Sequence, residues 1–230
     1  MEVYKKLDST NNIAKQRTKH GTVILAEEQT AGYGRRGRSF YSPPGHGIYM
    51  SLVIDPAKLG FASTPTLITV HTAVAVCEAI EEFCGKSPKI KWVNDIFLDG
   101  KKICGISAEA SERIVVGVGI NLNYFEPPEE LAQVIGTVFG KDEEPNIGKI
   151  ELAEHVADNI LTAPQSQAKL IESYKKRLFI LGKKVQVTAV GTNTAYEATA
   201  LDIDEQAQLI VKTEDGKIVS LFSGEISVSL

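Results

Sequence analysis

The chain has 230 residues, of which 43% are apolar and 23% are charged, and its formal net charge is −4. This composition supplies enough apolar residues for one packed domain with a small additional module. The acidic balance argues against a protein that acts on nucleic acid, because nucleic-acid-binding domains are usually basic. The three cysteines form no C-x-x-C pair, the N-terminus lacks a signal-peptide core, and no apolar run could span a membrane. We therefore expect free thiols, no membrane partner and a cytoplasmic location.

The first half of the chain alternates strand patterns with one long helix. Apolar residues recur at helical spacing over 64–84, and Gly85 is expected to end that helix. Asp99-Gly100 is typical of a tight hairpin turn. Apolar runs or alternation predict β-strands at 22–28, 48–54, 88–92, 101–110 and 113–121. This pattern favours an α+β fold, with a mixed, largely antiparallel sheet and flanking helices.

The second half begins with helices and ends with short strands. The spacing predicts helices at 127–139, 150–161 and 165–182. Short β patterns then follow at 184–188, 196–201, 209–211 and 218–221. Several short strands in the last fifty residues predict a small SH3-like β-barrel. We therefore expect a catalytic or binding domain over residues 1–182 and a separate C-terminal module over residues 183–230.

Residues 32–38 read G-Y-G-R-R-G-R and closely follow the strand expected at 22–28. Glycine lets the backbone approach a ligand closely, and the arginine guanidinium matches phosphate or carboxylate. The loop is therefore a candidate clamp over an anionic ligand. From these residues alone, a solvated basic loop and a nucleic-acid-binding patch are open alternatives.

Other polar residues fall at strand ends or at the start of a short helix that ends near Gly21. Ser9 or Thr10 is a good N-cap for that helix, and the same hydroxyls could face a polar ligand. Residues at strand ends are well placed to contact a ligand in a layered fold. The residues in such positions are Ser9, Thr10, Asn11, Gln29, Lys91, Asn94, Asp95, Gly105 and Asn121.

Taken together, these motifs resemble those of the biotin protein ligases over about residues 1–181. The loop at 32–38 resembles the family's G-R-G-R-R-G-R motif. Residues 91–95 (K-W-V-N-D) resemble its K-W-P-N-D motif. Residues 102–106 (K-I-C-G-I) resemble its K-I/L-x-G-I motif, and residues 116–121 (V-G-V-G-I-N) resemble the last six positions of its V-x-G-x-G-x-N motif. The motifs occur in the same order and at similar spacing, which makes them far more specific together than singly.

The resemblance implies an ATP-dependent enzyme that forms biotinyl-5'-AMP from biotin and ATP, with Mg²⁺ as activator. Biotin would then pass to a lysine of a biotin carboxyl carrier domain. The catalytic residues would be Lys91, which would bridge the biotin carboxylate and the α-phosphate, and Arg35. Biotin contacts are implied for Ser9, Thr10, Asn11, Gln29, Tyr33, Gly34, Arg35, Lys91 and Gly105. Adenylate contacts are implied for Arg35, Arg36, Arg38, Phe40 and Asn121, and Asp95 is a weaker candidate for Mg²⁺.

The sequence departs from the family pattern at two positions. Tyr33 replaces the usual arginine and removes one positive charge from the loop, although its ring could stack on a ligand. Val93 replaces the usual proline and should loosen the turn before Asn94.

The partners expected from the resemblance are biotin, ATP and the carrier domain. Some members also carry an N-terminal DNA-binding domain, but the motif at Ser9 begins too early to leave room for one. We therefore expect a short form with no nucleic-acid partner. Related enzymes often pair through sheet edges, so a homodimer is an open alternative. The rival functions are a lipoate or octanoyl ligase of related fold and a non-enzymatic nucleic-acid-binding protein.

Overall fold

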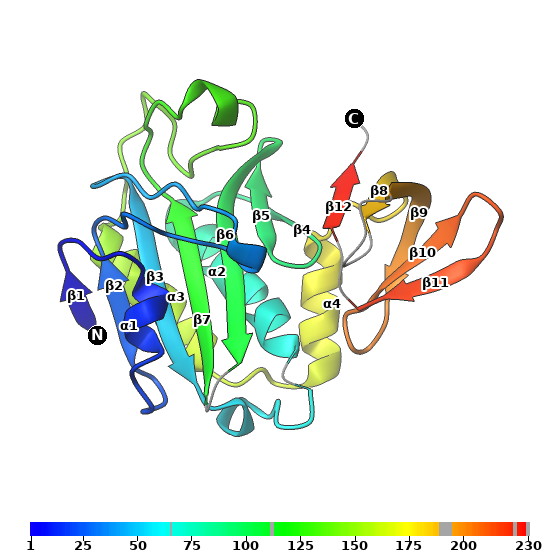
Figure 1. The fold of residues 1–230 in the computed structure, drawn as a ribbon, viewed down its shortest axis with the longest axis horizontal. Coiled ribbons are helices and arrows are strands. Elements are labelled where there is room, and N and C mark those ends of the chain that lie inside the picture. The colour runs from blue at the N-terminus through cyan, green and yellow to red at the C-terminus, as the bar shows by residue number, and fades with distance from the viewer. Residues whose placement is uncertain (65, 111–112, 189–194, 223–224, 229–230) are drawn as a thin grey trace.

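A computed structural model describes the chain except for residues 65, 111–112, 189–194, 223–224 and 229–230 (Figure 1). Within the described residues, the larger sheet has seven strands in the order β1-β2-β3-β7-β6-β5-β4. Neighbouring strands are antiparallel, except that β1 runs parallel to β2. The strands are β1 (Glu2–Tyr4), β2 (Val23–Ala26), β3 (Gly47–Ile54), β4 (Lys89–Lys91), β5 (Asp95–Leu98), β6 (Lys101–Ala110) and β7 (Ile114–Asn121). The predicted mixed, largely antiparallel sheet is confirmed.

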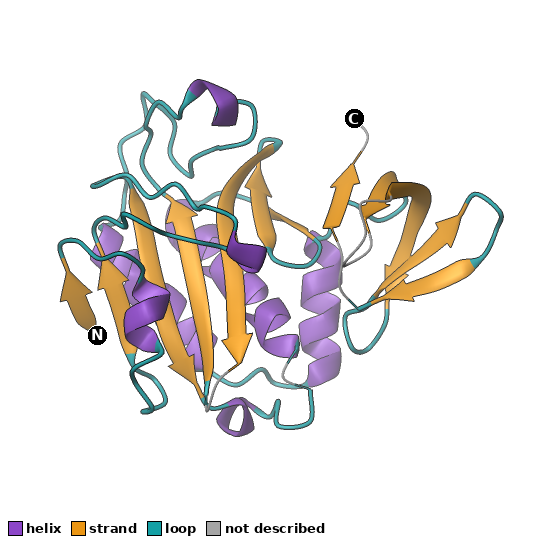
Figure 2. Ribbon diagram, in the orientation of Figure 1, coloured by secondary structure: helices purple, strands orange, loops and turns teal. Residues whose placement is uncertain are grey.

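Helices cover the two faces of this sheet unequally (Figure 2). The short helix α1 (Thr10–Ala14) lies on one face, against β2, β3 and β7. The longer helices α2 (Leu67–Cys84) and α3 (Lys149–Leu161) pack on the other face, and α4 (Gln167–Arg177) packs beside α2. None of these helices, within the part of the chain that the structure describes, is long and apolar enough to cross a membrane.

Helix α2 is the centre of the core because most of its residues are buried, among them Leu67, Ile68, Val76 and Ile80. Burying one such side chain contributes about 1.5 to 3 kcal/mol. The helix ends at Gly85, whose φ of 65° lies in the left-handed region that favours glycine. This end was predicted, whereas the helix begins at Leu67 rather than at residue 64.

The central strands carry two different surfaces because side chains alternate along them. On β7, the even-numbered residues Val116, Val118 and Ile120 belong to the core shared with α2 and α3. The odd-numbered positions Gly117 and Gly119 face the side that carries α1. Serines lie opposite Gly117 on both neighbouring strands, and Tyr49 and Gly105 lie opposite Gly119. A hollow over these glycines is therefore a consequence of strand register.

The C-terminal module is an antiparallel sheet of five described strands in the order β11-β10-β9-β8-β12. They are β8 (Lys184–Thr188), β9 (Ala195–Ile203), β10 (Leu209–Thr213), β11 (Ile218–Leu221) and β12 (Glu225–Val228). Figure 1 shows this sheet beside α4 and the edge of the larger sheet. Its buried residues, such as Val185 and Val211, continue the core of the larger domain. The predicted short β-strand module is thus confirmed, and it is packed rather than tethered.

One hydrogen bond joins the two sheets in addition to their apolar contacts, and a second holds the same segment against α4. The indole Nε1 of Trp92 donates to the carbonyl of Ala207 at 2.8 Å, in a buried position. The hydroxyl of Tyr174, on α4, donates to the carbonyl of Val93 at 3.0 Å. Both bonds fix the segment that follows β4.

The helix predicted at 127–139 is wrong. The segment contains only a short 3₁₀ turn, η3 (Glu129–Leu131), and then runs beside β6. The Lys102 amide donates to Val134 O at 2.8 Å, and the Gly136 amide donates to Lys102 O at 2.9 Å. The start of β6, which precedes its pairing with β7 at Cys104, therefore takes the backbone hydrogen bonds that a helix would have used. The helix predicted at 165–182 is also shorter, because α4 ends at Arg177.

His71, on α2, should make the protein lose stability as the pH falls. It is buried, its Nε2 lies 3.0 Å from the carbonyl of Ile160, and burial lowers its pKa. The unfolded chain, with an ordinary histidine pKa of about 6.5, then binds the proton more readily than the folded chain. Stability is therefore full above about pH 6.5 and falls below it, by at most about 1.4 kcal/mol per pH unit.

Urea unfolding of wild type and His71→Gln at about pH 7.5 and about pH 5.5 tests this expectation. The variant should lose less stability on acidification than the wild type does. Equal losses in the two proteins would show that His71 does not carry the effect.

Candidate functional site

A cavity of about 350 Å³ opens on the sheet face that carries α1. It lies between α1, the loop at 32–40, the segment at 91–95 and the glycines of β7, and two residues of the C-terminal module, Thr188 and Ile226, also line it. Its size is in the range of small-molecule sites. The predicted site residues that line it are Thr10, Asn11, Gln29, Tyr33, Gly34, Arg35, Arg38, Phe40, Lys91, Asp95 and Gly105.

One end of the cavity is a network of neutral polar groups. Thr10 donates to Gln29 Oε1 from its backbone amide at 2.9 Å and from its hydroxyl at 3.1 Å. The Ser51 hydroxyl lies 2.7 Å from Thr10 Oγ1 and 2.6 Å from Asn11 Oδ1. Asn11 Nδ2 lies 3.3 Å from Ser107 Oγ. Because α1 packs on the sheet, its first residues are buried, and these hydroxyl and amide groups are held in fixed positions.

The opposite end carries charged groups that come from three separate segments. Arg35 Nη1 donates to Asn94 Oδ1 at 2.8 Å, which ties the loop to the segment after β4. Asn94 Nδ2 donates to Asp95 Oδ1 at 2.9 Å and to the carbonyl of Ile106 at 3.0 Å. Asp95 Oδ1 lies 2.7 Å from Lys102 Nζ in an ion pair that is only about a quarter exposed. The cluster is therefore held from β5, β6 and the loop.

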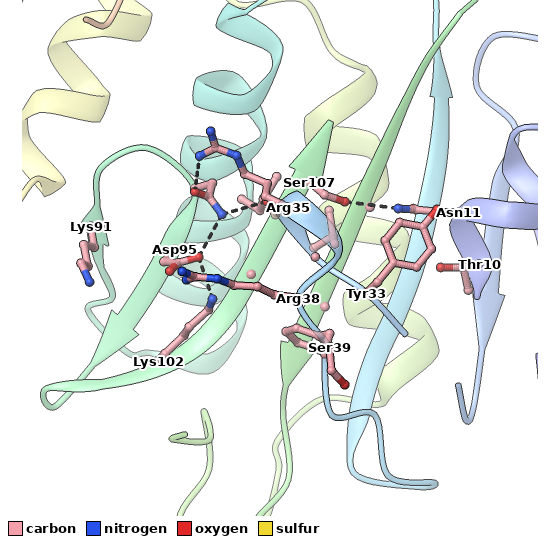
Figure 3. A pocket seen from close by; sticks show the side chains of 18 of the residues that line it. Thr10, Asn11, Tyr33, Arg35, Arg38, Ser39, Lys91, Asp95, Lys102 and Ser107 are labelled. Carbon is pink, nitrogen blue, oxygen red and sulfur yellow. Dashed lines mark hydrogen bonds and ion pairs between the residues drawn. The ribbon is translucent and has the colours of Figure 1, made fainter. Parts of the chain in front are cut away.

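Two further cations line the same cavity. Figure 3 shows the Arg38 side chain reaching toward Asp95, next to Lys102. The Lys91 side chain stands apart, at the margin of the labelled group. Lys91 Nζ lies 5.8 Å from the centre of the Phe97 ring. Positive charge thus surrounds one carboxylate, an arrangement suited to an anionic ligand.

Glycines form the floor between the two ends. A Cβ added at Gly117 would lie 2.5 Å from Asn11 Oδ1 and 2.7 Å from Ser107 Oγ. A Cβ added at Gly119 would lie 2.4 Å from the ring of Phe40. These distances are too short for real contacts, so glycine is required for the polar network and the aromatic ring to rest on β7.

A buried tyrosine supports the floor from the neighbouring strand. The ring of Tyr49 packs edge-on against Phe40, with ring centres 6.4 Å apart. The Tyr49 hydroxyl donates to the carbonyl of Pro43 at 2.9 Å, and burial raises its pKa above the ordinary value. The hydroxyl therefore stays protonated and acts as a fixed donor.

Three predicted residues are not part of the cavity wall as described. Ser9 is buried, and its amide donates to the side chain of Asp8 at 2.6 Å. Asn121 lies at the end of β7, where its Nδ2 donates to Gly136 O at 3.1 Å. Its Oδ1 is buried and has no hydrogen-bond partner among the described residues. The side chain of Arg36 lies outside what the structure describes.

Sequence reasoning did not assign several residues that the structure places in the wall. Lys102 falls inside a recognised motif, so the motif itself could have identified it. Ser107 and Gly117 also line the cavity, and Ser51 completes the polar network behind it. Gly117 belongs to the motif at 116–121, whereas Ser51 and Ser107 lie within strand patterns, where only the strand register reveals which face they occupy.

The cavity therefore combines three chemical environments in one continuous space. Neutral donors and acceptors at one end suit an uncharged polar ring. The cations near Asp95 and Asn94 suit a carboxylate or a phosphate. The aromatic ring of Phe40 on a glycine floor suits a flat ligand group. A reaction that brings two anionic groups together is compatible with this order of environments.

Comparison with known proteins agrees with this arrangement. The sequence pattern of the biotin/lipoate A/B protein ligase family matches residues 3–122, and that of the biotin protein ligase C-terminal domain matches residues 180–229. The bifunctional ligase/repressor BirA of Bacillus subtilis is 32% identical, over 96% of this chain and 70% of that protein. The biotin–acetyl-CoA-carboxylase ligase of Mycobacterium tuberculosis is 26% identical, over 90% of this chain and 78% of that protein. The solved biotin protein ligase from Aquifex aeolicus in complex with biotin and ATP superposes with a TM-score of 0.85 at 27% identity, covering 99% of this chain and 97% of that one.

Proposed function

This chain belongs to the biotin/lipoate A/B protein ligase family, and we propose that it is an ATP-dependent biotin protein ligase. In the first step, a carboxylate oxygen of biotin attacks the α-phosphorus of ATP, and pyrophosphate leaves. In the second step, the amine of a carrier lysine attacks the acyl carbon of biotinyl-5'-AMP, and AMP leaves. The observation that carries the proposal is one cavity with a neutral polar end, a cationic end and a glycine floor between them.

The neutral end is the proposed site of the biotin ring. A ureido group has both donors and acceptors, and hydroxyl and amide side chains can serve as either. Thr10, Asn11 and Gln29 supply such groups at this end, whereas Ser9 supports them from a buried position. Gly34 and Gly105 would let the ligand lie close to the backbone. Tyr33 closes the same end from the loop.

The opposite end is the proposed site of the nucleotide. Arg35 and Arg38 line it and would attract phosphates, and Arg36 remains a sequence-based candidate. Phe40 provides an aromatic face for the base. Asn121 lies at the end of β7, outside the described cavity wall, and remains a sequence-based candidate for contact with the adenylate.

The reacting anions require a fixed cation between them. The sequence prediction gives this role to Lys91, which lines the cavity. The geometry adds Lys102, whose ammonium lies over the floor: a Cβ added at Gly105 would be 3.3 Å from its Nζ. We expect both lysines to contribute, and Lys102 to contribute more because it lies nearer the centre of the charged cluster.

Mg²⁺ would act here with the nucleotide rather than in a protein cage. Among the described residues, no group of three histidine, cysteine or acidic side chains could hold a metal ion. Asp95 is the one carboxylate in the described cavity wall, and Mg²⁺ is commonly held by one or two carboxylates together with substrate phosphates. The residues present therefore fit an ion that enters with ATP and supplies charge neutralisation to its phosphates.

The remaining features of the proposal extend beyond the cavity. The acceptor is a biotin carboxyl carrier domain, and the protein acts in the cytoplasm without a nucleic-acid or membrane partner. A homodimer through a sheet edge is compatible with the short edge strand β1. We place the boundary between catalytic domain and C-terminal module at 182/183, where the chain turns at Gly182 into β8.

Incubation of the protein with biotin, ATP and Mg²⁺, followed by native mass spectrometry, tests the first step directly. Bound biotinyl-5'-AMP is the expected product, and a biotin carboxyl carrier domain added afterwards should gain one biotin. The same assay with lipoate distinguishes the rival activity of the family. Formation of a lipoyl adenylate without a biotinyl adenylate would show that the protein is a lipoate ligase and not a biotin ligase.

Substitutions at two glycines on the same face of β7 should affect the KM for biotin and the KM for ATP separately. Gly117→Ala pushes on Asn11 and Ser107, and Gly119→Ala pushes on Phe40. Overpacking of this kind costs about 1 to 3 kcal/mol, so each variant should raise one KM by roughly 5- to 150-fold. We expect the biotin KM to rise in Gly117→Ala and the ATP KM to rise in Gly119→Ala.

Gly148→Ala is the matched control, because its added Cβ meets no atom closer than 4.0 Å. Steady-state kinetics with each substrate varied in turn gives both constants. If both glycine variants raised the same KM, the proposed orientation of the substrates would be wrong.

A further inference from the structure

Tyr33 connects the Gly/Arg loop, residues 32–38, to helix α1. Lys15 Nζ donates to the Tyr33 hydroxyl at 3.0 Å, and that hydroxyl lies 3.2 Å from Asn12 Oδ1 as a donor. Lys15 Nζ also lies 5.5 Å from the centre of the Tyr33 ring. Asn12 belongs to α1 and Lys15 is its C-cap residue, so one tyrosine joins the loop to both.

Lys15 is fixed in turn by an acidic side chain on β6. Its Nζ lies 2.7 Å from Glu109 Oε2, and Glu109 Oε1 accepts from Asn11 Nδ2 at 3.0 Å. Hydrogen bonds with Glu109 and Tyr33 raise the pKa of Lys15, so it stays a charged donor. The pair is 38% and 35% exposed, and such a pair by itself stabilises little. Its effect is to place the ammonium where Tyr33 meets it.

The residue at position 33 is decisive for this connection. An arginine there, the residue usual in the matching motif, would put a second positive charge beside Lys15 and would be repelled. A tyrosine accepts the lysine hydrogen bond and offers a ring face to the cation. Opposite the connection at Tyr33, the loop is tied by the bond between Arg35 and Asn94. The loop is thus anchored on both sides of the cavity.

We propose that Tyr33 is a positioning residue, which holds the Gly/Arg loop over the Thr10 and Asn11 end of the cavity. The hydroxyl contacts with Lys15 and Asn12 carry this role. A consequence, which rests on the proposed function, is that biotin leaves slowly because the loop must first separate from α1.

Hydrogen–deuterium exchange of the unliganded protein tests the position of the loop without any ligand. Gly34, Arg38 and Phe40 donate their amides within or beside the loop, so these amides exchange when it opens. Tyr33→Phe and Lys15→Met should each speed exchange of peptides over 32–40 by roughly fivefold, which corresponds to a hydrogen bond of about 1 kcal/mol. Peptides of β7 should not change.

The controls separate the hydroxyl contact from general damage. Tyr41→Phe removes a hydroxyl from the neighbouring exposed tyrosine, whose ring packs on Phe125, and should leave loop exchange at the wild-type rate. The double variant Tyr33→Phe/Lys15→Met should speed exchange by less than the product of the two single effects, since both variants remove the hydrogen bond between Lys15 and the Tyr33 hydroxyl. Unchanged exchange in Tyr33→Phe, or fully additive effects, would overturn the proposal.

Stopped-flow measurement of biotin release then tests the consequence. Tyr33→Phe should release biotin roughly fivefold faster than wild type, with a smaller change in the association rate. Faster loop exchange with biotin release at the wild-type rate would refute the retention role. A wild-type protein that bound no biotin would overturn the proposed function, whereas the exchange result would still decide the position of the loop.

Discussion

Replacement of Lys102 with alanine is expected to lower biotin-dependent exchange of pyrophosphate into ATP by about 100- to 1000-fold, the effect typical of removing one preorganised charge-stabilising group. Lys102 Nζ is held 2.7 Å from Asp95 Oδ1 and stands over Gly105 on the cavity floor. Its position is therefore set before substrates bind. The biotin carboxylate and the α-phosphate repel each other as they approach, and a fixed ammonium offsets that repulsion most strongly in the transition state.

A second variant distinguishes this role from simple neutralisation of Asp95. Lys102→Met keeps much of the side-chain volume but leaves the Asp95 carboxylate without its partner ammonium. If Lys102 served only to balance that charge, Asp95→Asn added to Lys102→Met would restore exchange to the rate of Asp95→Asn alone. We expect no restoration, because the missing cation is the one that faces the substrates. Thermal unfolding of each variant confirms that the fold is retained.

Lys91→Ala provides the comparison within the same cavity. The sequence prediction makes Lys91 the bridging cation, and the structure places it in the wall but apart from the Asp95 and Lys102 pair. We expect Lys91→Ala to lower exchange clearly but less than Lys102→Ala does. A larger loss in Lys91→Ala would reverse the order and return the bridging role to Lys91.

The difference between Lys101 and Lys102 illustrates what a linear motif can reveal. Lys101 directly precedes the motif lysine, Lys102, and strand alternation puts the two side chains on opposite faces. Lys101 is exposed and donates to the carbonyl of Ala132, whereas Lys102 lines the cavity. The register that decides between them includes an irregularity between Ile96 and Phe97 on β5. No local pattern announces that irregularity, so strand periodicity alone could not choose the lysine, whereas the family motif at 102–106 includes Lys102 and not Lys101.

The sequence predicted the fold well where a segment carried a strong local signal, such as a turn dipeptide. Asp99-Gly100 forms the expected hairpin, with φ of 50° and 78° at its two residues. The helix prediction for residues 127–139 failed because the backbone of this segment pairs with β6 and with the end of β7, which is a tertiary effect. The edge strand β1 was missed for a similar reason: its three residues pair in parallel with β2, and so short a strand has little pattern of its own. Distant partners decided both segments.

Arg35→Gly should turn a carrier-specific ligase into one that labels proteins at random. Arg35 Nη1 donates to Asn94 Oδ1 at 2.8 Å, which closes the loop across the charged end of the cavity. Glycine removes this bond and adds backbone freedom to the loop. The mixed anhydride biotinyl-5'-AMP would then escape or meet water and foreign amines. We expect adenylate formation to continue and labelling of a non-carrier protein, such as serum albumin, to rise roughly tenfold or more, as the loss of one charged hydrogen bond implies.

Two further variants test whether the loop contact itself is responsible. Asn94→Ala removes the partner of Arg35 and should also increase random labelling, while Arg113→Gly should not. Arg113 pairs with Asp55 at 3.1 Å, and both lie at the opposite ends of β7 and β3 from the residues that meet the cavity floor. Mass spectrometry of albumin and carrier domain in the same reaction measures the ratio directly. Strictly carrier-specific labelling by Arg35→Gly, with adenylate formation intact, would show that something other than this loop retains the intermediate.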